Sequence, residues 1–285
     1  MNVVISMPVH ENYDCVINYL ENVQKYVKTC RGVVIHVSGD SDISLYSNLV
    51  KASEDQFRDF LFVNPTRYRT SKPGEAGNVT GLSTVYSSNF RYISKLFKFD
   101  IYSLCNSNEM FVREGLDDLV NNNLYQFQVL NAPNNGKERL PHPVGGPDWN
   151  SGVGCWAEIL KNKYNCEFPE FGWVVGSLMP FTVWERLSSI ILDELSQEDW
   201  LLKGGVLALE EYIIPTLIFK LYPELYEKLI PVSYVLCPQD YNPHAWSIPE
   251  NLVLDIRNGV YPNRFSVKRV PRDISHPIRV FINKL

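Results

Sequence analysis

Short apolar runs alternate with longer amphipathic stretches along the first third of the chain. Unbroken apolar runs are typical of strands buried on both faces, whereas apolar residues that recur every three or four positions indicate helices. The pattern predicts strands at residues 3–9, 32–38, 59–65 and 99–105, and helices at residues 13–28, 44–60 and 82–96. Because strand and helix alternate with short connections, we expect an α/β fold with a mostly parallel central sheet and helices on both faces.

A long segment without a periodic pattern follows in the middle of the chain. Residues 131–156 are rich in Pro, Gly and Asn, and a loop of this length inside a compact chain is usually functional. We expect a lid or a flap over a binding site. Trp149 and Trp156 in this loop could stack on a ring of a ligand, or could equally anchor the loop on the core.

Two further patterns lie in the last third of the chain. Residues 170–191 predict a strand, a turn at the Gly-Ser pair 176–177 and then a helix. Residues 207–225 predict a helix that opens with two adjacent carboxylates, Glu210 and Glu211. Adjacent residues of a helix point in different directions, so the two carboxylates are expected to have different surroundings.

Polar clusters follow three of the predicted strands. His10 comes directly after the first strand, residues 38–42 (SGDSD) after the second, and residues 106–109 (NSNE) after the fourth. Loops are polar for structural reasons too, so one such cluster alone would predict little. Because ligands of parallel sheets bind at the carboxyl ends of the strands, three clusters on one edge favour a binding site there.

Composition narrows the class of protein. The chain has 285 residues, 45% of them hydrophobic, and shows no repeat or linker, so we expect a single domain over residues 1–285. A formal net charge of -5 argues against a protein that coats nucleic acid, because that role needs a broad basic surface. No segment approaches the ~20 apolar residues of a membrane span, so we expect no span and leave peripheral association with a membrane open.

The cysteines and the N-terminus indicate a compartment. The six cysteines show no CxxC pair and lie mostly in apolar stretches, which is typical of reduced thiols in a core. The first apolar run is short, lacks a basic leader and is interrupted at Pro8, which indicates a buried strand and not a signal peptide. We therefore expect a cytoplasmic protein.

Several short motifs occur in an order that resembles one family. They are MPVH at 7–10, IHVS at 35–38, the polar turn within 104–112, the Gly-Ser strand within 171–181, EYIIPT at 211–216 and FSVK at 265–268. Together they resemble the core-2/I-branching N-acetylglucosaminyltransferase and peptide O-xylosyltransferase family of inverting glycosyltransferases. The second-strand acid of that family is displaced here from Ser38 to Asp40, and Glu109 takes the place of the acid in the later turn. The resemblance implies a GT-A-like fold, with a nucleotide-sugar-binding half at 1–125 and an acceptor and catalytic half at 126–285.

The resemblance also implies a reaction. It is the transfer of a sugar from a nucleotide sugar, which we expect to be a UDP-sugar, to a hydroxyl of a glycan, as in polysaccharide biosynthesis, with no metal cofactor. In many nucleotide-sugar transferases two aspartates hold a divalent cation at the turn that reads NSNE here, and neutral amides are poor ligands for such a cation. Fixed cations can stabilise the leaving diphosphate instead. The locally basic tail supplies Lys268, Arg269 and Arg272.

Site residues follow from the resemblance, residue by residue. Inverting transfer needs a general base that takes the proton of the acceptor hydroxyl, and the matching residue is Glu211, with Glu210 as the alternative. Glutamates at helix starts are also common for dipole reasons. From the resemblance we expect Glu211 to face inward and Glu210 outward. The expected donor-binding residues are Pro8, His10, Ser38, Asp40, Asn106, Asn108, Glu109, Lys268, Arg269 and Arg272. The expected acceptor-binding residues are Trp149, Glu170 and Trp173.

Two other hypotheses stay open on the sequence alone. The first is a metal-dependent glycosyltransferase in which Asp40 and Asp42, or Glu109, bind Mn²⁺ or Mg²⁺, and it predicts that a chelator abolishes activity. The second is a catalytically inactive relative that binds sugars. Such a protein would bind a donor without releasing nucleoside diphosphate.

Overall fold

The structure is a computed structural model. It describes residues 1–10, 12–70, 81–122, 124–129, 162–165, 172–195, 210–230, 233–237 and 247–285. The loop predicted at 131–156, with Trp149 and Trp156, lies outside these residues, as does Glu170.

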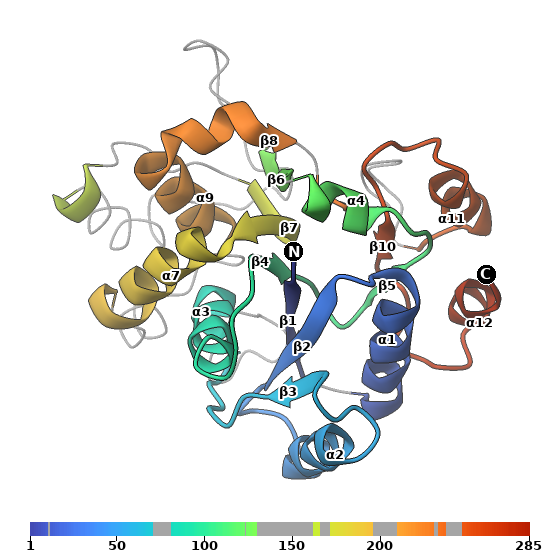
Figure 1. The fold of residues 1–285 in the computed structure, drawn as a ribbon. Coiled ribbons are helices and arrows are strands. Elements are labelled where there is room, and N and C mark those ends of the chain that lie inside the picture. The colour runs from blue at the N-terminus through green and yellow to red at the C-terminus, as the bar shows by residue number, and fades with distance from the viewer. Residues whose placement is uncertain are drawn as a thin grey trace, which may run out of the picture.

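Within the described ranges, a seven-stranded sheet has the strand order β3-β2-β1-β4-β7-β6-β8 (Figure 1). Its strands are β1 (Val3–Val9), β2 (Cys30–Val37), β3 (Leu61–Val63), β4 (Ile101–Leu104), β6 (Tyr125–Val129), β7 (Gly172–Pro180) and β8 (Leu229–Ile230). Strand β1 pairs in parallel with β2 and β4, β2 with β3, and β6 with β8, whereas β7 runs antiparallel to β4 and β6. The predicted mostly parallel sheet is confirmed.

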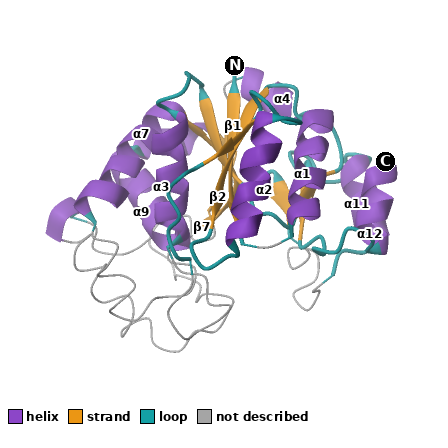
Figure 2. Cartoon of the chain, turned by 90° about the horizontal axis from the view of Figure 1, so that it is seen from below, coloured by secondary structure: helices purple, strands orange, loops and turns teal. Residues whose placement is uncertain are grey.

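Helices cover both faces of this sheet, as Figure 2 shows, so the predicted α/β class is also confirmed. Helices α1 (Tyr13–Tyr26) and α2 (Ile43–Glu54) lie on one side, and α3 (Leu82–Ile93), α7 (Phe181–Ser189) and α9 (Glu210–Leu221) lie on the other (Figure 2). The remaining helices are α4 (Leu116–Asn121), a π-helical turn (Ile190–Glu194), a 3-10 helix (Pro223–Lys228), α11 (Glu250–Arg257) and α12 (Pro277–Lys284).

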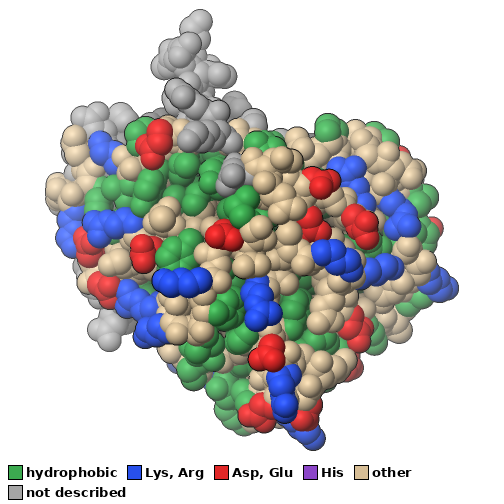
Figure 3. Space-filling view, in the orientation of Figure 1, with side chains coloured by type: hydrophobic (Ala, Val, Ile, Leu, Met, Phe, Trp, Pro, Cys, Tyr) green, Lys and Arg blue, Asp and Glu red, His purple; other side chains and the backbone are tan. Residues whose placement is uncertain are grey.

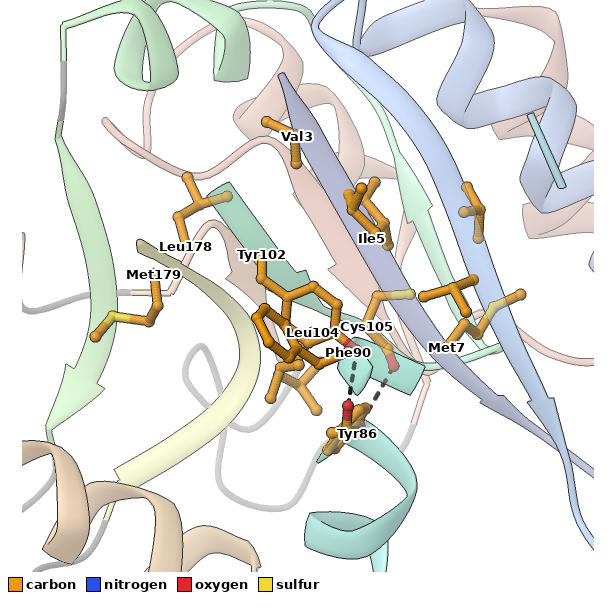
Figure 4. Close-up of a cluster of buried hydrophobic side chains, with 14 of the residues drawn as sticks. Val3, Ile5, Met7, Tyr86, Phe90, Tyr102, Leu104, Cys105, Leu178 and Met179 are labelled. Atoms are coloured by element: carbon orange, nitrogen blue, oxygen red, sulfur yellow. Dashed lines mark hydrogen bonds between the residues drawn. The ribbon is translucent and has the colours of Figure 1, made fainter. Parts of the chain in front are cut away.

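The central strands are buried because helices cover them from both sides. Every residue of β1 is buried, and the core around it contains large aromatic side chains of α3 and β4 (Figure 4). The hydroxyl of Tyr102 donates to the backbone O of Tyr86 at 2.8 Å, and the hydroxyl of Tyr86 donates to the backbone O of Cys105 at 3.4 Å. These bonds hold the first turns of α3 against the carboxyl end of β4.

A second, smaller sheet connects the chain's end to its first half (Figure 1). It contains β5 (Glu109–Phe111), β10 (Ser266–Lys268) and β9 (Val235–Leu236), in the order β5-β10-β9. An apolar cluster shared with α11 and α12 supports it, and β10 pairs antiparallel with β5. The basic tail is thereby placed beside the polar turn that follows β4.

Two observations bear on binding to polymers and on crossing a membrane: the charges on one face of the molecule and the character of the described helices. On the face drawn in Figure 3, Lys and Arg side chains are interspersed with Asp and Glu, and no broad basic area of the kind that binds nucleic acid is present on it. Among the described residues, no helix combines the length and the apolar character that crossing a bilayer requires.

The turn predicted at residues 176–177 is wrong, because β7 runs unbroken through this pair. Gly176 has a positive φ of 75° inside the strand, and the register of the β6–β7 pair shifts nearby, between Gln126 and Gln128. Its carbonyl oxygen accepts a hydrogen bond from the backbone N of Tyr234 at 3.1 Å. Glycine is needed here because another segment of backbone approaches closely.

We expect Gly176→Ala to lower the free energy of unfolding by about 3 kcal/mol or more, from a steric clash together with an unfavourable backbone conformation. An added Cβ would overlap Oγ of Ser233 and lie 2.5 Å from Cγ2 of Val235. Gly81→Ala is the matched control, because Gly81 has a φ of 80° but no atom within 4 Å of such a Cβ. Urea unfolding of both variants measures the difference, and equal losses of stability would show that the close approach at Gly176 is unimportant.

Candidate functional site

A pocket of about 130 Å³ lies at the edge of the sheet where β1 and β4 end. Its lining comes from five described segments of the chain: the end of β1, the chain after β3, the start of α3, the turn between β4 and β5, and the tail after β10. The lining residues are Pro8, Val9, His10, Thr70, Leu82, Asn106, Ser107, Asn108 and Arg272. Five of these, Pro8, His10, Asn106, Asn108 and Arg272, are predicted donor-binding residues.

Backbone pairing explains why the segments meet. Strands β1 and β4 are parallel neighbours, so their carboxyl ends lie at the same edge, and the backbone N of Cys105 donates to Ser6 O at 2.9 Å. The tail is joined to the same place, since the backbone N of Val270 donates to Asn108 O at 2.9 Å. Nε of Arg272 then donates to Oγ of Ser107 at 3.3 Å. The guanidinium of Arg272 is thus held at the pocket.

Lys268 lies directly behind the pocket turn. In the β5–β10 pair it is opposite Glu109, which puts the two side chains on the same face of the small sheet. The side-chain amide of Asn106 lies 3.2 Å from Nζ of Lys268, and with its oxygen facing the ammonium it accepts a hydrogen bond while its nitrogen donates to Cys105 O at 3.3 Å. Lys268 is therefore joined to the pocket lining through Asn106.

Glu109 is fully buried and lies behind the pocket rather than in its lining. Its Oε1 accepts a hydrogen bond from Oγ of Ser266 at 3.0 Å. Burial raises the pKa of its carboxyl to about 8, while the hydrogen bond from Ser266 and the charge of Lys268 act in the opposite direction. Glu109 is therefore described among the residues behind the pocket, and its predicted role in donor binding stays a prediction.

The expected orientation of the two glutamates at the start of α9 is wrong. Glu210 is the buried one, with 5% of its surface exposed, and Glu211 is half-buried. Burial and the charge of the neighbouring Glu211 raise the pKa of Glu210 to about 8, against the lowering effect of Lys268. The physical reason lies in the helical period: residue 210 shares a face with Ile213 and Leu217, both of which are buried in the core.

Ser38 and Asp40 act through Thr70 rather than in the pocket itself. Oγ of Ser38 lies 2.8 Å from Oγ1 of Thr70, and the backbone N of Thr70 donates to Oδ2 of Asp40 at 3.2 Å. Asp40 also accepts a hydrogen bond from Nε of Arg69 at 2.5 Å. Both predicted residues thus fix a segment that contributes Thr70 to the lining.

The histidine of the second strand has a structural role. His36 is fully buried, and its Nε2 accepts a hydrogen bond from the backbone N of Tyr68 at 2.9 Å. Burial lowers the pKa of His36 to about 4, so the ring is neutral at physiological pH. The bond holds the chain that leads to Thr70 against the end of β2.

The acidic residues proposed for a metal site are engaged elsewhere. The carboxylate of Asp42 caps α2 by accepting a hydrogen bond from the backbone N of Ser44 at 2.8 Å, and Asp40 is bonded to Arg69. Glu109 is buried behind the pocket. In the part of the chain that the structure describes, no group of three or more His, Cys, Asp or Glu side chains is arranged to hold a metal ion.

Of the remaining predicted residues, Arg269 is described outside the pocket lining, and the three acceptor-binding side chains are not described. Arg269 lies between Lys268 and Val270 with a left-handed backbone, at a φ of 71°, and it is not part of the lining. Trp173 belongs to β7, and the structure does not describe its side chain. Trp149 and Glu170 lie outside the described residues, so acceptor binding is untested for all three.

The sequence analysis did not predict four of the lining residues, Val9, Thr70, Leu82 and Ser107, and it gave Glu210 the wrong orientation. Glu210 had a usable signal, since the buried residues of α9 recur three, four and seven positions after it. Leu82 was predicted only as the start of a helix. Thr70 had no signal, because residues 64–70 follow no periodic pattern and reach the pocket through side-chain hydrogen bonds.

Comparison with known proteins gave partial likenesses among solved structures. No family model matches the chain, and no curated protein sequence matches it. The mannosyltransferase PcManGT from Pyrobaculum calidifontis, solved with GDP-Man and Mn²⁺, is 13% identical with a TM-score of 0.29, over 42% of this chain and 30% of its own. TarS from S. aureus is 15% identical with a TM-score of 0.30, over 50% of this chain and 24% of its own. The bifunctional glycosyltransferase WbbM, solved in its apo form, is 10% identical with a TM-score of 0.45, over 99% of this chain and 51% of its own. The chain thus spans about half the length of WbbM and less of the other two.

Proposed function

We propose that this chain is an inverting glycosyltransferase that moves a sugar from a nucleotide sugar, a UDP-sugar, to a hydroxyl of a glycan without a metal ion. One observation supports it above the others. Five separate segments of the chain meet in one pocket, and five of the ten residues expected to bind the donor line it. The described residues enclose less room than the ~300–1,000 Å³ usual for small-molecule sites, which suits one part of a donor, the diphosphate.

The chemistry of the lining suits a diphosphate. The guanidinium of Arg272 lies in the pocket wall, and Lys268 is joined to that wall through Asn106. The amides of Asn106 and Asn108 can donate further hydrogen bonds. As the bond between sugar and diphosphate breaks, negative charge grows on the diphosphate, and fixed cations with preorganised donors stabilise that charge. In this proposal Lys268 and Arg272 take the role that a divalent cation plays in metal-dependent enzymes.

Glu211 is the proposed general base. It lies in the first turn of α9, and its half-buried position leaves its carboxylate accessible to an acceptor, whereas Glu210 is 5% exposed. The carboxylate would take the proton of the acceptor hydroxyl as its oxygen attacks the anomeric carbon from the face opposite the diphosphate. The proton and the leaving diphosphate thus depart on opposite sides of the sugar.

The test is the release of nucleoside diphosphate from a panel of UDP-, GDP- and dTDP-sugars. Slow hydrolysis, with water in place of the acceptor, makes the assay usable before the acceptor is known. We expect Glu211→Gln to reduce release by about 10²-fold or more, because it removes the base. Glu210→Gln is the matched control, with a smaller expected reduction.

Two outcomes would contradict the proposal. Full turnover by Glu211→Gln would remove Glu211 from the base role. Binding of a donor without release of diphosphate, for every sugar in the panel, would favour the inactive sugar-binding protein.

A further inference from the structure

Behind the pocket, two buried carboxyl groups flank one lysine. Glu109 lies opposite Lys268 in the β5–β10 pair, and Glu210 approaches from the start of α9. The charge of Lys268 lowers the pKa of both carboxyls, which places the ammonium within electrostatic reach of each. Lys268, itself half-buried, thus interacts with two buried acidic groups.

Both carboxyls keep one oxygen without a hydrogen-bond partner among the described residues. These atoms are Oε2 of Glu109 and Oε2 of Glu210, and both residues are at least nine-tenths buried. A buried carboxylate in this position is costly unless a cation offsets its charge or a proton neutralises it. The protonation state of Glu109 therefore depends on how strongly the ammonium of Lys268 interacts with its carboxylate.

We propose that Glu109 is a positioning residue for Lys268, and that it takes up one proton from solvent when a nucleoside diphosphate binds beside that lysine. In the empty protein above about pH 8, where Glu109 is ionised, its carboxylate helps to hold the ammonium in the pocket wall. The bound diphosphate becomes a second anionic partner of the ammonium, and the carboxylate then becomes a neutral carboxylic acid. The inference rests on the proposed function, because it assumes that the pocket receives a diphosphate.

The direction of the pH dependence follows from the charges. The pKa of Glu109 is about 8 in the empty protein, where Lys268 holds it down against the effect of burial. A diphosphate adds negative charge beside Lys268 and raises this pKa further. Proton uptake by Glu109 on binding is therefore greatest just above pH 8. The affinity for the diphosphate falls as the pH rises through this region.

The tyrosine and cysteine side chains around Glu109 and Lys268 do not supply the proton change. Those that face Glu109 or Lys268 are Tyr19 of α1, Tyr86 of α3, Cys105 after β4, Tyr234 before β9, and Glu210 of α9. Burial raises the pKa of each of these tyrosines and of the cysteine well above its ordinary value, so they stay neutral at pH 8 to 9. Glu210 is the remaining acid, and its own variant tests it.

Calorimetric titration with UDP at pH 8.5, in buffers of different ionisation enthalpy and with excess EDTA, measures the protons taken up on binding. GDP and dTDP serve as further probes. UDP contributes little itself, because its terminal phosphate, with a pKa of ~6, is fully ionised at this pH. We expect wild type to take up a measurable fraction of a proton that Glu109→Gln does not. Wild-type affinity should also fall by up to about tenfold per pH unit above pH 8, with a flatter profile in Glu109→Gln.

Each other outcome overturns the inference in a recognisable way. Equal uptake by wild type and Glu109→Gln, or uptake lost in Glu210→Gln alone, would remove Glu109 from this role. Binding by wild type without any uptake would do the same, even if Glu109→Gln did not fold. If wild type binds none of the three diphosphates, the proposed function fails, and the inference fails with it.

Discussion

Replacing Arg272 with alanine is expected to lower nucleotide-sugar turnover by about 10²–10³, because one preorganised donor to a developing anion is worth that much. Arg272 lines the pocket, and its Nε donates to Oγ of Ser107 at 3.3 Å, so its guanidinium is fixed before a ligand arrives. The loss should appear mainly in kcat, because negative charge on the diphosphate grows during the reaction. Steady-state release of nucleoside diphosphate measures it.

Arg58→Ala is the matched control for this result. Arg58 is an exposed arginine after α2 whose Nε donates to the backbone O of Glu54 at 2.9 Å, remote from the pocket lining. Its turnover should equal that of wild type. A loss of tenfold or less in Arg272→Ala, in a variant that folds normally, would contradict the assignment of Arg272 to the diphosphate.

The second large effect concerns stability against pH. We expect the free energy of unfolding to fall by several kcal/mol between pH 5 and pH 8, because Glu109 and Glu210 both have a pKa of about 8 in the folded chain against an ordinary value of 4.5. The unfolded chain loses these protons from about pH 4.5 upward, whereas the folded chain keeps them up to about pH 8, so stability is fully present below pH 4.5 and is lost through this window. Each unit of pKa difference corresponds to about 1.4 kcal/mol.

Urea unfolding at pH 5, 6.5 and 8 measures this fall. Glu109→Gln and Glu210→Gln should each flatten the profile, since a glutamine cannot ionise. The combined effect in the double variant should be less than additive, because both carboxyls interact with Lys268. Glu224→Gln, at an exposed position of the 3-10 helix, is the control and should keep the wild-type slope. A wild-type profile without a slope would contradict the burial of these carboxyls.

Much of the main sheet could be predicted from the sequence, because its strands are continuous apolar runs. The first predicted strand, 3–9, coincides with β1, and the second, 32–38, differs from β2 (Cys30–Val37) by a residue or two at its ends. The apolar character is a local signal, and burial by helices on both faces produces it directly. Because neighbouring parallel strands end at the same edge of the sheet, the edge at which the polar clusters meet could be predicted as well.

The small sheet could not be predicted, because its strands are two or three residues long and pair across a large sequence separation. The pairing of Lys268 with Glu109 therefore had no local signal, although both residues had been selected for their chemistry. The orientation of α9, by contrast, could have been predicted from its sequence. Its period already placed residue 210 with Ile213 and Leu217, and the expectation for Glu211 followed the resemblance instead of that period.

The central claim is that fixed cations, and not a bound metal ion, stabilise the leaving diphosphate. The most direct measurement is nucleoside diphosphate release from UDP-sugar by wild type and by the Lys268→Ala, Arg272→Ala double variant, both with excess EDTA. The account predicts that wild-type release persists in the chelator and that the double variant loses it. Wild-type release that stops in EDTA and returns with Mn²⁺ would contradict the account and assign the role to a divalent cation.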